Sequence, residues 1–92
     1  MNDFLEELGE SWRRAAAARE AAIEAPLLDP KLAQELLELA RVAAHTHERR
    51  FAPLASYLAG VATERLRAQR PELSPEEILA YVREVRESVE AG

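Results

Sequence analysis

The chain contains two histidines, His45 and His47, separated by one residue, a spacing that suggests a metal or catalytic site. On an α-helix, residues two apart point about 160° away from each other, at about 100° per residue. The two imidazoles therefore cannot bind one ion on a continuous helix. Neither histidine has a His, Asp or Glu four residues away, the spacing of two ligands on one helix face. We expect no intrachain metal site, with His45 and Glu48 as a remaining two-ligand alternative.

Catalysis has little support in the residue types present. The chain lacks cysteine, and its only aspartates, Asp3 and Asp29, stand where helix caps are expected. No Ser-His-Asp triad can be ordered from these residues, and no phosphate-binding loop, dinucleotide fingerprint or H-E-x-x-H motif occurs. The sequence predicts a chain without catalytic residues, without a cofactor and without enzymatic activity.

A more specific hypothesis is a ligand-binding row on one helix. Arg41, His45 and Arg49 are spaced four residues apart, so on a continuous helix they share a face and present positive charge. Such a row could bind the phosphate of a nucleotide or a pterin, although two nearby glutamates oppose anion binding. His45 is expected on the outer face, exposed to solvent or in contact with a partner. His47 is expected on the apolar side of the helix, partly buried.

Residues 51–63, FAPLASYLAGVAT, form a run without charge in a chain that is 32% charged. At helical spacing, the residues expected to face inward are Leu54, Leu58, Val61 and Ala62. The opposite face carries the small residues Ser56, Ala59, Gly60 and Thr63. Glycine lowers helix stability by about 1 kcal/mol relative to alanine, but small residues let another backbone approach closely. This helix is therefore either buried on both sides, or its Ser56 and Gly60 face docks on a second subunit or partner.

Four helices are expected to position these residues, because apolar side chains recur at helical spacing and strand-like alternation is almost absent. Their ends are marked by Pro26, by Pro53, and by Ser74 with Glu77, which form a capping box. The predicted helices cover about residues 3–25, 30–50, 53–69 and 75–90. With short connections they predict an all-α fold, a small antiparallel four-helix bundle that forms a single domain of residues 1–92.

Composition restricts the possible partners. The net charge of −5 disfavours binding to nucleic acid and to anionic membranes. The uncharged run is too short to cross a bilayer, and the acidic start of the chain does not resemble a signal peptide. With the lack of cysteine, these features favour a cytoplasmic location. A chain of 92 residues builds a modest core, so association with a second copy or another protein is a ready way to add buried surface.

The segment LLELARVAAHTHERRFAPLASYLAGVA, residues 36–62, resembles a small bacterial helical domain family of unknown function. Members of that family occur alone or joined to molybdenum-cofactor guanylyltransferase-type domains. The matching parts are the leucine-rich LLELAR helix, the AH and ER pairs, APL and YLAG. The resemblance implies that His45, Arg49 and Pro53 belong to the family signature. It also implies a link to molybdenum-cofactor metabolism.

We therefore expect a non-catalytic helical accessory domain for protein interaction, linked to molybdenum-cofactor biosynthesis or molybdoenzyme assembly. Its contact residues would be Arg41, His45, Arg49, Ser56 and Gly60, and its partner would be a second copy, forming a homodimer, or another protein. The alternative is a small nucleotide- or pterin-binding domain that uses the face formed by Arg41, His45 and Arg49.

Overall fold

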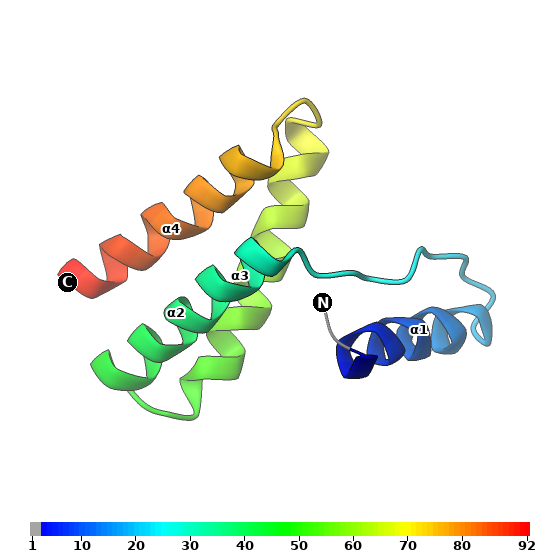
Figure 1. Ribbon diagram of the computed structural model, residues 1–92, viewed down its shortest axis with the longest axis horizontal. Coiled ribbons are helices and arrows are strands. Elements are labelled where there is room, and N and C mark those ends of the chain that lie inside the picture. Colours follow the sequence, from blue (N-terminus) through cyan, green and yellow to red (C-terminus); the bar gives the residue numbers. More distant parts are fainter. Residues whose placement is uncertain (1–2) are drawn as a thin grey trace. The chain divides into compact units, whose positions relative to one another are not determined.

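The computed structural model describes residues 3–92, which form four α-helices and no strand (Figure 1). These are α1 (Asp3–Ala17), α2 (Pro30–Thr46), α3 (Phe51–Gln69) and α4 (Pro75–Ala91). The prediction of an all-α fold with four helices is confirmed. The chain divides into two compact units, one that ends at Pro30 and one that runs from Lys31 to Gly92, and each is described by itself. The antiparallel packing of all four helices as a single domain stays a prediction.

The first unit begins with α1, which ends at Ala17, so its predicted extension to residue 25 is wrong. The amide of Ala21 donates to the carbonyl of Ala16, and the amide of Glu20 donates to the carbonyl of Ala17. Glu20 adopts the left-handed conformation, with φ of 61°. This is a Schellman-type helix end, in which glycine usually occupies the left-handed position. Because a glutamate stands there instead, the sequence carries no mark of the stop.

The segment that follows α1 turns back and brings Pro26 against the helix. Gly9 is the buried residue of α1, and a Cβ added to it would lie 2.4 Å from the carbonyl oxygen of Pro26. Real Cβ atoms essentially never approach another heavy atom within 3.0 Å, so only glycine allows this crossing. Gly9 therefore decides where the returning segment passes over α1.

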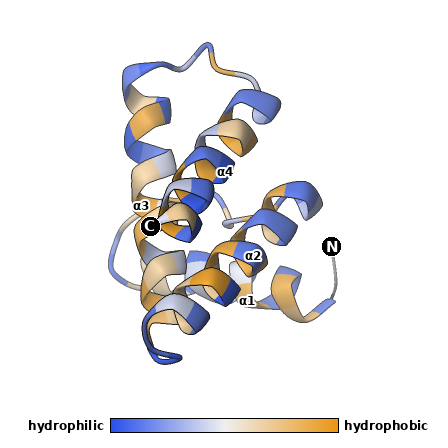
Figure 2. Cartoon of the chain, turned by 90° about the vertical axis from the view of Figure 1, so that its left-hand side faces the viewer, coloured by the Kyte–Doolittle hydropathy of each residue, from blue (hydrophilic) through white to orange (hydrophobic). Residues whose placement is uncertain are grey.

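In the second unit, α2 and α4 supply the buried apolar side chains. These are Ala33, Leu39 and Val42 of α2 with Ile78 and Val82 of α4. Leu39 and Val42 are three residues apart, and Ile78 and Val82 are four apart, which is the spacing of an amphipathic helix that packs one side on a core. Figure 2 shows apolar and polar segments alternating along α4, in keeping with that pattern. The buried residue of α3 is a threonine, Thr63.

The start of α4 has the predicted capping box. The Ser74 hydroxyl accepts a hydrogen bond from the Glu77 amide at 3.1 Å, and the Glu77 carboxylate accepts one from the Ser74 amide at 3.0 Å. The hydrogen bond from the Ser74 amide is the main reason why the pKa of the Glu77 carboxyl lies below its ordinary value. Pro75 occupies the first turn, where its missing amide proton costs nothing.

The connection between α2 and α3 differs from the prediction at both ends. α2 ends at Thr46 rather than near residue 50, and the Thr46 hydroxyl donates to the Val42 carbonyl at 2.7 Å. α3 begins at Phe51 rather than at Pro53, because the Phe51 amide donates to the Glu48 carbonyl at 2.9 Å. The proline is thus accommodated in the first turn of α3, which its ring tolerates.

Candidate functional site

Both histidines lie where α2 ends. His45 belongs to the last turn of α2 and is exposed, as predicted for its outer face. His47 follows the end of the helix and is also exposed, so its predicted partial burial is wrong. The Nδ1 atom of His47 lies 2.9 Å from the Thr46 hydroxyl. Within residues 3–92, no group of three or more His, Asp or Glu side chains is arranged to hold a metal ion.

The expected row of Arg41, His45 and Arg49 does not form, because α2 ends one residue after His45 and Arg49 lies in the following turn. The Arg41 guanidinium contacts Glu38 at 2.9 Å and Glu90 of α4 at 3.6 Å. Its charge is therefore already shared with two carboxylates, and Arg49 is an exposed turn residue. The three-residue cationic face on which a nucleotide or pterin site would depend is absent from this part of the structure.

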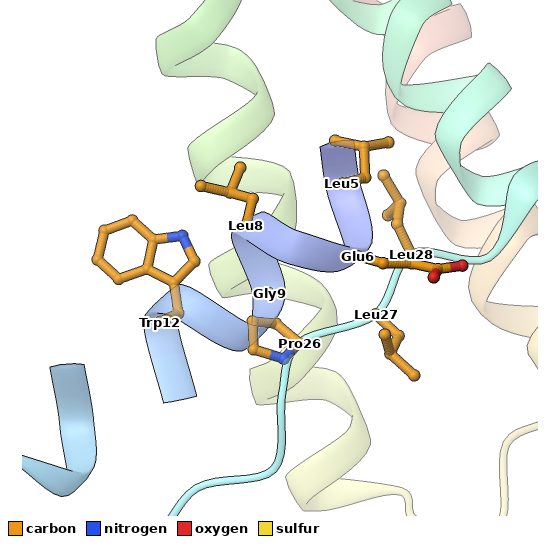
Figure 3. Close-up of a pocket in the computed structure, with 8 residues that line it drawn as sticks. All are labelled: Leu5, Glu6, Leu8, Gly9, Trp12, Pro26, Leu27 and Leu28. Carbon is orange, nitrogen blue, oxygen red and sulfur yellow. The ribbon is translucent and has the colours of Figure 1, made fainter. Parts of the chain in front are cut away.

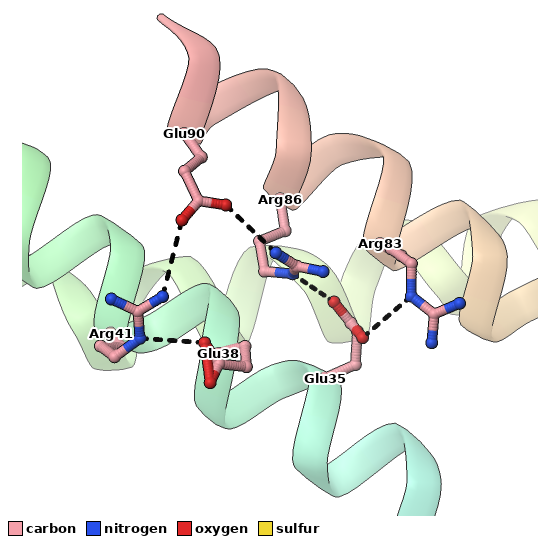
Figure 4. A network of polar contacts seen from close by, with 6 residues as sticks. All are labelled: Glu35, Glu38, Arg41, Arg83, Arg86 and Glu90. Atoms are coloured by element: carbon pink, nitrogen blue, oxygen red, sulfur yellow. Dashed lines mark hydrogen bonds and ion pairs between the residues drawn. The ribbon is translucent and has the colours of Figure 1, made fainter.

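A polar network that the sequence did not predict connects α2 and α4 (Figure 4). Glu35 is buried, and its carboxylate accepts hydrogen bonds from Arg86 and, at 3.3 Å, from Arg83. Arg86 also contacts Glu90 at 3.2 Å. The hydrogen bond to Glu35 raises the pKa of the Arg86 guanidinium, which keeps its charge fixed. Two arginines of α4 thus converge on one carboxylate of α2, and charge-assisted hydrogen bonds tie the two helices together.

The sequence did contain a sign of this network. Glu35 stands three residues after Leu32 and four before Leu39, so it interrupts the apolar stripe of α2. A charge at such a position is buried unless the helix rotates, and a buried carboxylate needs a cationic partner. Arg83 and Arg86, three residues apart on the next amphipathic helix but one, were available for that role.

The faces of α3 are arranged differently from the prediction. Leu54 and Leu58, expected to face inward, are exposed together with Tyr57, with exposed fractions between 58% and 71%. The opposite, small-residue face turns partly inward: Thr63 is buried, and the half-buried Ser56 hydroxyl donates to the Ala52 carbonyl at 3.2 Å. The inward assignment of the two leucines is therefore wrong.

Gly60 lies at an open position of α3. A Cβ added to it would meet no atom within 4 Å. Gly60 and Ser56 therefore do not present one common exposed face, because Ser56 is half-buried and hydrogen-bonded within its own helix. The contact between Gly60 and a partner stays a prediction.

An apolar groove runs between α3 and α4, with a volume of about 260 Å³. It is lined by Leu39, Ala55, Leu58, Ala59, Ala62, Tyr81, Val82, Val85 and Val89. A neighbouring hollow shares Leu58, Ala62 and Tyr81 with it and extends it towards Arg65. We call the surface formed by these two hollows the α3/α4 groove. Apart from Arg65 at one end and the Tyr81 hydroxyl, its lining offers no polar side chain.

The first unit has an apolar surface of its own (Figure 3). Leu5, Leu8 and Trp12 of α1 line a pocket of about 420 Å³ with Pro26 and Leu27 of the returning segment. Leu8 and Trp12 of this lining follow Phe4 at four-residue spacing, and the exposed fractions of the three side chains lie between 40% and 68%. The returning segment crosses α1 at Gly9, and its Pro26 and Leu27 line the pocket with Leu8 and Trp12, which are 40% and 59% exposed.

A family model described as a domain of unknown function, DUF6457, matches residues 5–92. The chain belongs to the DUF6457 family. No curated protein and no solved structure matches it. The match begins within α1 and includes residues of both compact units, whereas the resemblance noted from the sequence covered residues 36–62 only. The expectation of a small domain of unknown function is confirmed, and the family description names no activity. Within residues 3–92, no helix is both long enough and apolar enough to span a membrane.

Proposed function

We propose that this DUF6457 domain is a non-catalytic accessory domain that binds a helix of a protein partner through the α3/α4 groove. The observation that carries the proposal is the exposure of Leu58, which is 66% exposed and lines an apolar groove. Scattered apolar residues on a protein surface are ordinary, but a contiguous patch next to a groove usually marks an interaction site.

The shape and chemistry of the groove favour a helix as its occupant. Two helices form its walls, and alanines at positions 55, 59 and 62 line it between larger side chains. An amphipathic helix can place large apolar side chains over such small residues and leave its polar side in water. The groove offers almost no hydrogen-bonding group, so specificity for a polar small molecule has little to depend on.

The ionisable groups also favour binding over catalysis. Those with shifted pKa values owe the shift to local structural partners: Glu77 to its helix cap, Arg86 to the hydrogen bond with Glu35, and Glu10 to a hydrogen bond with Arg13. None of these residues lines the α3/α4 groove. A catalytic cleft would be expected to collect groups whose pKa values are shifted by burial and by each other.

The proposed setting of this function is molybdenum-cofactor biosynthesis or molybdoenzyme assembly. Its support is the resemblance of residues 36–62 to a family joined to molybdenum-cofactor guanylyltransferase-type domains. Titration of the purified chain with such a domain from the same organism, followed by calorimetry, tests it. Binding to the wild type that is lost in Leu58→Glu supports this setting. The absence of binding heat at every concentration used contradicts the setting, and the interaction role is then tested by the next experiment.

Site-specific photo-cross-linking in cells tests the interaction role. A benzophenone amino acid replaces Leu58 in the groove, and in a matched variant it replaces Gln34, an exposed polar residue of α2 outside the groove. We expect a discrete protein adduct from position 58 and none from position 34, with the partner identified by mass spectrometry. Equal labelling at the two positions, or no adduct from position 58, refutes the proposed function.

A further inference from the structure

We infer that the partner helix in the α3/α4 groove carries an Asp or Glu side chain, whose carboxylate is bound by Arg65 and the Tyr81 hydroxyl at one end of the groove. The inference rests on the proposed function and defines the chemistry of the partner. It starts from the observation that Arg65 and Tyr81 line the same hollow, of about 480 Å³, whose other lining side chains are apolar. Both residues belong to the second compact unit.

Arg65 has no carboxylate partner within its own chain, although acidic residues outnumber basic ones. The chain has 17 Asp and Glu residues against 12 Lys and Arg residues. The arginines that follow it, Arg67 and Arg70, are each paired with a nearby glutamate. In the part of the chain that the structure describes, the exposed Arg65 makes neither an ion pair nor a hydrogen bond with its side chain. Its guanidinium can therefore bind a carboxylate from outside through two parallel hydrogen bonds.

Tyr81 contributes a second donor to the same hollow. Its side chain is half-buried on α4 and lines both hollows of the groove. Among residues 3–92, no group forms a hydrogen bond with its hydroxyl. A tyrosine hydroxyl needs a hydrogen-bond partner once the surface around it is covered. A carboxylate can accept from this hydroxyl and from a guanidinium together, because its two oxygens offer about four acceptor sites.

The place of the hollow determines where the partner carries its carboxylate. Arg65 follows Ala55 by ten residues on α3, which is about 15 Å along the helix axis at about 1.5 Å per residue. Between them, α3 lines the groove with Leu58, Ala59 and Ala62. A partner helix of about three turns covers this length. Its apolar residues, at three- and four-residue spacing, lie over the alanines, and its acidic residue lies at the end over Arg65.

The apolar surface and the pair of donors have separate tasks. Burial of apolar surface supplies affinity and does not distinguish the direction of a bound helix. One cation at one end of the groove distinguishes the two directions, and it disfavours a helix that places Lys or Arg there. Because Arg65 is exposed, its pair with the carboxylate is expected to change the affinity by only about three- to tenfold.

Selection from a library of helical peptides displayed on phage is the first test. The library holds apolar residues at three- and four-residue spacing and is randomised at both ends, and the full chain is the bait. We expect the binders that Leu58→Glu no longer retains to be enriched in Asp or Glu at one end. With Arg65→Glu as bait, we expect Lys or Arg at that position instead. Binders that depend on Leu58 but show no acidic preference overturn the inference and retain the proposed function, whereas no Leu58-dependent binder overturns both.

A double-mutant cycle with the best peptide measures the contact itself. In the peptide, the acidic residue is replaced by its amide, and in the chain Arg65→Gln removes the cation. We expect each change alone to weaken binding about three- to tenfold, and the peptide change to have no further effect on Arg65→Gln. Tyr81→Phe keeps the ring and is expected to weaken binding of the acidic peptide more than binding of its amide form. Additive effects of the peptide change and Arg65→Gln refute the contact.

Arg67→Gln is the matched control, because it removes the same charge from the same helix but Arg67 lines neither hollow. It is expected to change binding of the acidic peptide by less than about twofold. Equal losses in Arg65→Gln and Arg67→Gln indicate general attraction between charges and overturn the site. Decanoate is the small-molecule probe, since it joins a carboxylate to an apolar chain. Binding of decanoate that requires Arg65, without binding of any acidic peptide, overturns the helical occupant. All variants are expected to keep the wild-type circular dichroism at 222 nm.

Discussion

Replacing Gly9 and Gly60 by alanine is expected to change stability in opposite directions, although both glycines lie within helices. At Gly9 the new Cβ would stand 2.4 Å from the Pro26 carbonyl oxygen, and at Gly60 it would meet nothing within 4 Å. The pair therefore separates the intrinsic helix preference of alanine, which is common to both sites, from the steric cost, which exists only at Gly9.

The magnitudes follow from these two terms. Alanine stabilises a helix interior by about 0.5–1 kcal/mol relative to glycine. At Gly9 the obstacle is a backbone carbonyl rather than a flexible side chain, so the returning segment must shift, and such overpacking costs about 1–3 kcal/mol. The net expectation is a gain of about 0.5–1 kcal/mol for Gly60→Ala and a loss of about 0.5–2 kcal/mol for Gly9→Ala.

Urea unfolding followed by two probes gives the result for each unit. Trp12 is the only tryptophan and lines the pocket beside Pro26, so its fluorescence reports on the first unit. Circular dichroism at 222 nm reports on all four helices. We expect Gly9→Ala to move the fluorescence midpoint to lower urea, and Gly60→Ala to move the circular dichroism midpoint to higher urea. If both variants are stabilised, the close crossing of Pro26 over α1 is wrong.

Three other substitutions test the local interactions. Glu35→Ala removes the acceptor shared by Arg83 and Arg86 and is expected to lower the free energy of unfolding by about 1–3 kcal/mol, whereas Glu38→Ala at the exposed pair with Arg41 stays within about 0.5 kcal/mol. Glu20→Gly relieves the strain of the left-handed conformation and is expected to raise the free energy of unfolding by about 0.5–1 kcal/mol. Glu24→Gly in the returning segment is the control and is expected to give no gain. Equal effects of the two substitutions contradict the assigned helix end. Because the pKa of Glu77 is lowered by folding, its contribution is complete above its ordinary value of 4.5 and is lost as the pH falls through the folded-state pKa. The melting temperature of the wild type should therefore exceed that of Glu77→Gln at neutral pH and approach it in acid, and a difference that is constant with pH argues against the capping role.

The elements with strong local signals were predicted well. α4 begins at the proline that follows Ser74 and ends one residue beyond the predicted limit, because a capping box and a proline act through hydrogen bonds within one turn. The end of α1 was missed because its left-handed residue is Glu20, which carries no preference for that conformation. A helix end set by backbone geometry alone is invisible to residue-type rules.

His47 and Arg49 were misplaced for a related reason. Their predicted faces assume one continuous helix over residues 30–50, whereas α2 ends at Thr46. An error of four residues in a helix end left His45 on its predicted face, but it moved His47 and Arg49 off the helix. Candidate sites deduced from helical spacing are thus most fragile near the helix end, which is where this chain carries its polar motif.

α3 shows what periodicity can and cannot decide. The sequence assigns Leu54 and Leu58 to one face of α3 and the small residues Ser56, Ala59, Gly60 and Thr63 to the other. Which face turns inward depends on the neighbours. In the second unit, Thr63 of the small-residue face is buried and Gly60 of the same face is exposed, while Leu58 lines the groove together with Ala59. A helix with two packable faces can use one within its own unit and the other for association, because both would otherwise leave apolar surface in water. The same absence of charge that suggested a buried central helix is therefore also what an interface requires.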